Sequence, residues 1–126
     1  MEMFGGPVAE RLEAAGRAVE LNRRAAAGHS AGADQFGLAL SLQCEGDAFR
    51  SAARFSKGAE SVAAYQRSRD LYQESLGILR SLQNSDRLSA AGKALLFTVG
   101  NDLADNGERL RSSTLPANSV MPGGAR

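Results

Sequence analysis

Apolar residues recur at helical spacing, three to four residues apart, in four successive segments of this chain. The first segment begins with Pro7, which suits the first position of a helix, and is followed by Gly28, a common C-terminal stop. The pattern therefore predicts a helix over about residues 7–27. Its apolar positions are Val8, Leu12, Ala15 and Val19.

The second segment predicts a helix over about residues 31–56, with Ser30 available as its N-cap. Glycines at positions 32, 37 and 46 each weaken this helix by up to about 1 kcal/mol relative to alanine. They either fray its first turns or allow close packing against another helix. The apolar positions are Phe36, Leu40, Cys44 and Ala48, with Leu38, Leu42 and Phe49 beside them.

Two further helices are predicted, over about residues 60–83 and 86–111. Gly58 can take the left-handed conformation at the break before the third helix, and either Asn84 or Ser85 can cap the fourth. The apolar positions of the fourth helix are Leu88, Ala91, Leu95, Val99, Leu103 and Leu110.

Residues 1–112 are expected to form a single all-α domain, because no segment alternates apolar and polar residues over the length of a strand. Short loops between four helices place neighbours antiparallel, which predicts an up-down antiparallel four-helix bundle. Residues 113–126 contain two prolines, two glycines and no periodicity. They are expected to form a mobile, disordered tail.

The third predicted helix carries two apolar stripes instead of one. A helix that packs between several neighbours needs a wider apolar arc than a helix with one neighbour, so this helix is expected to be central. Either both stripes are used inside the bundle, or some of this surface, with the adjoining part of the fourth helix, forms a groove for a partner's amphipathic helix. The first stripe comprises Val62, Tyr65, Tyr72, Leu76 and Leu79, and the second comprises Leu71, Ile78 and Leu82.

The fourth helix also has a wide apolar arc, because Leu96 and Phe97 lie beside its main stripe. This width favours a groove between the third and fourth helices. Alternatively, Phe97 faces the first helix.

The chain has 126 residues, of which 43% are hydrophobic and 23% charged, a composition typical of one globular domain. No apolar run approaches the roughly 18 residues of a membrane span. The N-terminus lacks the pattern of a secretion signal, so a cytoplasmic location without direct membrane insertion is expected. Fifteen basic and fourteen acidic residues are interspersed, and without a basic stripe nucleic acid is not an expected partner.

The sequence contains few residues of the types that form disulfides, metal sites or catalytic sites. Cys44 is the only cysteine and His29 the only histidine, which excludes an intramolecular disulfide and a zinc site of the Cys/His type. Cys44 falls on the helical stripe and is expected to be a small core residue. His29 lies in a predicted loop without an orienting acid, and the acidic pairs on helices are typical of solvated surfaces. No enzymatic activity, cofactor or bound metal is expected.

Residues from about 38 to 111 resemble the microtubule-interacting and trafficking (MIT) domain, a three-helix module, and especially the variant at the end of the Unc-51-like autophagy kinases. The resemblance rests on "ARFSKGAESVAAYQRSRDLYQESLGIL", a helix, a glycine-containing turn and a long helix, and on "LADNGERLR" at residues 103–111. In the second stretch Leu103, Ala104, Asn106 and Gly107 replace the family's aromatic, leucine, arginine and alanine, while Glu108, Leu110 and Arg111 agree in type.

The resemblance implies a non-catalytic adaptor that holds a partner's amphipathic helix or peptide between its last two helices, in autophagy or membrane trafficking. Residues that match the family pattern and would line or support that groove are Tyr65, Leu103, Glu108 and Leu110. Stripe geometry adds Tyr72, Leu96 and Val99 to the predicted partner-binding set.

Two alternatives remain open from the sequence. The same surface could join two copies of the chain in a homodimer. The Ala, Gly, Ser and Arg bias also suits a bacterial secretion-system chaperone or a self-assembling helical subunit, whose partner is another subunit.

Overall fold

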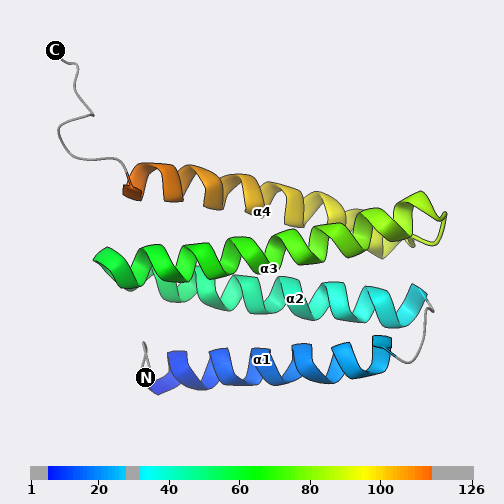
Figure 1. The fold of residues 1–126 in the computed structure, drawn as a ribbon, viewed down its shortest axis with the longest axis horizontal. Coiled ribbons are helices and arrows are strands. Elements are labelled where there is room, and N and C mark those ends of the chain that lie inside the picture. Colours follow the sequence, from blue (N-terminus) through cyan, green and yellow to red (C-terminus); the bar gives the residue numbers. More distant parts are fainter. Residues whose placement is uncertain (1–5, 28–31, 115–126) are drawn as a thin grey trace, which may run out of the picture.

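A computed structural model describes residues 6–27 and 32–114, and within these ranges it contains α-helices and no strand. The helices are α1 (Gly6–Ala27), α2 (Gly32–Arg54), α3 (Gly58–Asn84) and α4 (Ala90–Thr114). Consecutive helices lie side by side and alternate in direction (Figure 1). The predicted all-α helical bundle is confirmed, and the first three helices begin and end within two residues of their predicted bounds.

The fourth helix begins four residues later than predicted, because Asp86 has a φ of 59° and cannot be helical. Asp86 and Arg87 instead terminate α3: the Arg87 N–H donates to the Leu82 carbonyl at 2.8 Å, in the manner of a Schellman motif. The cap of α4 is Ser89, whose Oγ accepts a hydrogen bond from the Gly92 N–H at 3.1 Å. Asn84 and Ser85, the predicted caps, belong to the end of α3.

The last helix also ends later in the sequence than predicted. Helix α4 continues to Thr114, past the predicted boundary at residues 112 and 113. The rest of the predicted tail lies outside the described residues, as do His29 and Ser30.

Helices α2 and α3 form a tightly packed antiparallel pair at the centre of the molecule. Three serines on α3, spaced seven residues apart, donate their hydroxyls to carbonyls on α2 that are spaced seven apart in the opposite direction. The bonds join Ser61 to Ala53 at 2.9 Å, Ser68 to Gly46 at 2.7 Å and Ser75 to Ala39 at 2.7 Å. Because every acceptor residue is alanine or glycine, the two backbones can come close enough for these bonds.

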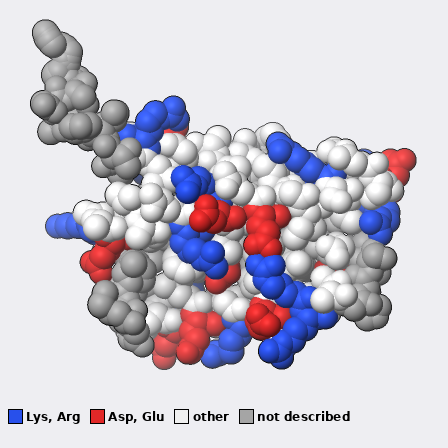
Figure 2. All heavy atoms as spheres, viewed as in Figure 1, with Lys and Arg blue, Asp and Glu red and all other residues white. Residues whose placement is uncertain are grey.

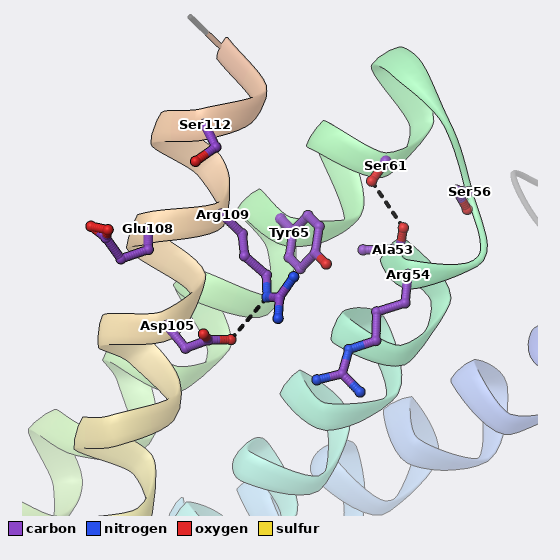
Figure 3. Close-up of a pocket in the computed structure, with 9 residues that line it drawn as sticks. All are labelled: Ala53, Arg54, Ser56, Ser61, Tyr65, Asp105, Glu108, Arg109 and Ser112. Carbon is purple, nitrogen blue, oxygen red and sulfur yellow. Dashed lines mark hydrogen bonds and ion pairs between the residues drawn. The ribbon is translucent and has the colours of Figure 1, made fainter.

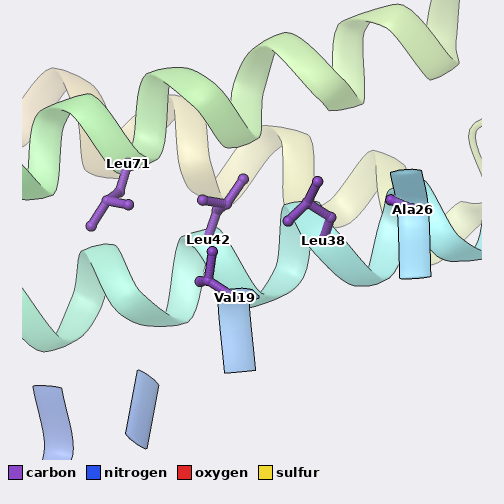
Figure 4. Close-up of a cluster of buried hydrophobic side chains, with 5 residues drawn as sticks. All are labelled: Val19, Ala26, Leu38, Leu42 and Leu71. Atoms are coloured by element: carbon purple, nitrogen blue, oxygen red, sulfur yellow. The ribbon is translucent and has the colours of Figure 1, made fainter. Parts of the chain in front are cut away.

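The outer helices α1 and α4 lie on opposite sides of this central pair and, among the described residues, do not contact each other. On the α1 side, Val19 and Ala26 pack against residues of α2 and α3 (Figure 4). On the α4 side, Val99 packs with Tyr72, Leu76 and Leu79 of α3. The bundle is therefore layered, without one core shared by all four helices.

This layering explains the two apolar stripes of α3. Leu71 belongs to the cluster on the α1 side, Tyr72 and Leu76 belong to the cluster on the α4 side, and Ile78 packs against both. The prediction that this helix is central is confirmed. Both stripes are used inside the molecule.

The predicted apolar stripe of α2 is wrong in part. Cys44 is exposed rather than part of the core, and Leu40 is 41% exposed. The face of α2 that packs against α3 instead contains Ala39, Gly46 and Ala53. Small side chains give a weak hydrophobic pattern, so the stripe predicted from the sequence was based on the larger residues.

Candidate functional site

The structure distributes the seven predicted partner-binding residues between the core and the surface. Tyr72 and Val99 are fully buried, Tyr65 and Leu110 are nearly so, Leu96 and Leu103 are partly buried, and Glu108 is exposed. Side chains of the molecule itself fill the seam between α3 and α4, with Tyr72 and Val99 in one cluster. A partner therefore cannot reach Tyr72 or Val99 in this structure, because at these positions the two helices contact each other.

An open cavity of about 540 Å³ lies at one end of this seam, where α2 ends, α3 begins and α4 passes by (Figure 3). We call it the end cavity. Its lining residues are Ala53, Arg54, Ser56, Ser61, Tyr65, Asp105, Glu108, Arg109 and Ser112. Tyr65 and Glu108 were predicted as partner-binding residues, and Leu110, also predicted, packs in a buried cluster with Tyr65.

Local packing holds Tyr65 in this cavity. Its ring packs with Ala53 of α2 and Leu110 of α4, so three helices enclose it. The hydrogen bond from Ser61 Oγ to the Ala53 carbonyl fixes the first turn of α3 against the end of α2. The position of the Tyr65 hydroxyl is therefore set by rigid helices rather than by a loop.

The α4 wall of the cavity is an ion-pair network. Arg109 Nε donates to Asp105 Oδ2 at 3.0 Å, and Arg50 of α2 bonds both Asp105 and Asp102, the latter at 3.0 Å. The hydrogen bond from Arg109 holds the pKa of Asp105 below its usual value. Asp105 is therefore a carboxylate at neutral pH, and its charge is balanced by two arginines.

Other groups that line the cavity also make hydrogen bonds or ion pairs within the molecule. Ser56 Oγ donates to the Ala52 carbonyl at 2.8 Å, and Glu108 pairs with Arg111 at 2.9 Å on the exposed side of α4. Arg54 and the Tyr65 hydroxyl, in contrast, make no hydrogen bond or ion pair within the described residues. The uncommitted polar groups thus include a cation and a hydroxyl, and both can donate hydrogen bonds to an incoming ligand.

Figure 3 shows how the charged side chains enter this space. Arg54 extends from the last turn of α2 and Arg109 from α4, toward the region between these helices, and the Tyr65 ring lies beside Arg109 with its hydroxyl turned toward α2. A carboxylate that entered there could accept hydrogen bonds from Arg54 and Tyr65 together.

Sequence reasoning missed Arg54, Ser61 and the Asp105–Arg109 pair. Two signals were available: Ser61 shares heptad spacing with Ser68 and Ser75, and Asp105 precedes Arg109 by four residues. Nothing in the local sequence distinguishes Arg54 from other arginines, since its role depends on where α4 passes.

A second cavity, of about 360 Å³, lies beside α3 and is lined in part by Gln35, Glu74 and Ile78. Glu74 there is bound by Arg23 of α1, with Nη2 and Oε1 2.8 Å apart. Charges of both signs are interspersed over the face shown in Figure 2, and no broad region of that face has one sign.

No protein-family model, curated protein or solved structure matches this chain. None of the helices in the described residues is both long and apolar enough to cross a membrane. The site must therefore be interpreted from its geometry.

Proposed function

We propose that this protein is a non-catalytic interaction module that binds an acidic segment of a partner protein in the end cavity. The observation that carries the proposal is the pair of uncommitted donors, the Arg54 guanidinium and the Tyr65 hydroxyl, in an open cavity between three helices. The carboxylate of an Asp, a Glu or a chain terminus is the complementary group in a peptide.

The charge balance of the cavity supports an acidic ligand. Asp105 is neutralised by Arg109 and Arg50, and Glu108 by Arg111, so Arg54 provides the unbalanced charge among the lining residues. A ligand carboxylate would restore the balance, whereas a ligand cation would meet Arg54 without a free acid to pair with. Such a polar contact at the rim of an interface sets specificity and the rate of association more than affinity.

The proposal narrows the one made from the sequence. It keeps a peptide ligand and keeps Tyr65 and Glu108 as lining residues, but places binding at one end of the α3–α4 seam. The role in autophagy or membrane trafficking and the cytoplasmic location remain predictions from the sequence.

Selection of peptides from a random displayed library against the immobilised protein tests this function. We expect the selected peptides to contain Asp, Glu or a free C-terminal carboxylate, and to lose binding to the Arg54→Glu variant. The matched control is Arg80→Glu, which reverses an exposed charge on α3 outside the cavity and should leave binding intact.

Two results would contradict the proposal. One is selection of peptides without acidic groups. The other is equal binding of the selected peptides to wild type and to Arg54→Glu, with both proteins shown to be folded by circular dichroism.

A further inference from the structure

The outward side of α4 is a second surface that the end cavity does not explain. Helix α4 lies at one edge of the molecule, with α3 on its inner side and no described helix beyond it (Figure 1). Phe97 projects from this side and is 72% exposed. Residues at helical spacing around it are exposed and uncharged; with Phe97, we call them the outer face of α4: Ala94, Phe97, Asn101 and Ala104.

The opposite edge of the molecule is built differently. On α1, Glu13 pairs with Arg17 at 3.1 Å and Glu20 with Arg24 at 3.2 Å, and all four side chains are well exposed. Charged side chains of this kind are the usual covering of a solvated helix. The outer face of α4 lacks such a covering for about three turns, which is typical of a surface that is buried against something else.

Two glycines beside this face, Gly100 and Gly107, reinforce this interpretation. A Cβ added at either position would meet no atom within 4 Å, so packing within the molecule does not require glycine there. Glycine inside a helix is nevertheless less stable than alanine by roughly 1 kcal/mol. The missing side chains leave one low surface at Gly100, a turn from Phe97, and another at Gly107, beside Ala104, and a large side chain of a partner could rest on either.

We propose that the outer face of α4 binds the same face of a second copy of this chain, with the two helices antiparallel and the two-fold axis between Gly100 and Asn101. In this register Phe97 of each copy lies over Ala104 of the other, beside the low surface at Gly107. The contact is the same in both directions, as a closed symmetric dimer requires.

Charge complementarity favours this register over one shifted by three residues. It places Lys93, which makes no side-chain bond in the described residues, opposite Glu108 of the second copy, so that Glu108 would be shared between Lys93 and Arg111 of its own helix. A shift of the pairing by three residues would bring Lys93 against Arg111 instead, and two cations would then face each other. Of these two registers, only the proposed one brings opposite charges together at the ends of the apolar contact.

An exposed aromatic ring that fills a pocket in a partner is the usual source of affinity in such contacts. Here two rings would be buried at once, one from each copy. The proposal goes beyond the end cavity. Glu108 lies at the edge of both surfaces, but Arg54 and Tyr65, which carry the proposed peptide binding, take no part in the α4–α4 contact.

Sedimentation equilibrium of the purified chain over a wide concentration range tests the dimer. We expect reversible dimerisation in wild type and at least about a tenfold rise in the dissociation constant for Phe97→Asp. The matched control is Leu21→Asp, which places the same charge at an exposed leucine of α1 and should leave the dissociation constant unchanged.

The charged ends test the register. Lys93→Glu and Glu108→Lys should each weaken the dimer, and the double variant should recover much of the wild-type affinity. A second measurement uses Asn101→Cys in a Cys44→Ser background, which should give a disulfide-linked dimer on mild oxidation.

A chain that stays monomeric up to millimolar concentration would overturn the proposal. So would a dimer that Leu21→Asp disrupts and Phe97→Asp does not. Because Arg54→Glu should leave sedimentation unchanged and Phe97→Asp should leave acidic-peptide binding measurable, failure of one proposal can be distinguished from failure of the other.

Discussion

The ring of Tyr72 on α3 lies directly against the backbone of Gly46 on α2. A Cβ added at Gly46 would be 2.6 Å from the Tyr72 Cε1 atom, closer than any real contact. The ring is fully buried, and its hydroxyl is hydrogen-bonded to Asp47, so it cannot easily move away. This contact sets how closely the central helix pair can approach.

Gly46→Ala is therefore expected to destabilise the protein, although alanine is the better helix former. Overpacking of this kind lowers the free energy of unfolding by about 1–3 kcal/mol. The measurement is urea denaturation followed by circular dichroism. The matched control is Gly77→Ala, at an exposed position of α3 with no atom within 4 Å of the added Cβ, which should be neutral or stabilising by up to about 1 kcal/mol. Equal effects of both variants would contradict the close packing.

Ser68→Ala is expected to cost more stability than Ser75→Ala. Both hydroxyls are buried and donate to a carbonyl of α2, but Ser68 Oγ also accepts a hydrogen bond from Asn106 of α4 at 2.8 Å. Removal of Ser68 leaves the buried Asn106 amide without that acceptor, which typically costs about 1–3 kcal/mol. Ser75→Ala leaves no such group and should cost about 1 kcal/mol. Denaturant titration of the two variants side by side measures the loss of unfolding free energy in each and shows which loss is larger.

Glu45→Gln should stabilise the protein at neutral pH. Glu45 is only 8% exposed, and burial raises the pKa of its carboxyl group. A raised pKa in the folded state means that this group favours folding below its unfolded pKa and that the contribution is lost as pH rises through the folded pKa. The difference in unfolding free energy between the variant and wild type should therefore grow as pH rises from acid to neutral. A difference that is constant with pH would contradict the assignment.

Glu74→Gln should show the opposite pH dependence. The hydrogen bond from Arg23 lowers the pKa of Glu74, so its contribution to stability is present above the unfolded pKa and is lost as pH falls through the folded pKa. The variant should be less stable than wild type at neutral pH, and the difference should disappear in acid. Because both side chains are part exposed, added salt should reduce the effect. Thermal unfolding at several pH values measures it.

The pattern of the sequence was sufficient for the helices and for the central place of α3. Periodic large apolar residues such as Leu76, Leu79 and Val99 indicate a helix with a buried face, because removing these side chains from water lowers the free energy of the folded state. The glycine at position 58 marked a break between helices, and its φ of 61° confirms the left-handed conformation. The predicted start of the fourth helix was wrong, because Asp86, a favourable residue for a first helical turn, instead lies in the turn that ends α3.

The candidate site could be predicted only in part. Tyr65 and Glu108 were predicted as partner-binding residues because they match the pattern of the MIT family, and both line the end cavity. Tyr72 and Val99 carry the same apolar signal as a binding surface, yet are buried. An apolar side chain does not indicate whether its own chain or a partner will cover it.

By itself the sequence determined where the helices run and which of them needs two neighbours, since these depend on local propensity and on the spacing of large apolar groups. Only the tertiary structure decided that α2 and α3 meet through serine, alanine and glycine, that Cys44 faces outward, and that Arg54 and Tyr65 share a cavity. The reason is physical: close approach and charge pairing depend on distances between residues far apart in the chain, and a small side chain exerts its effect through the neighbour that it admits.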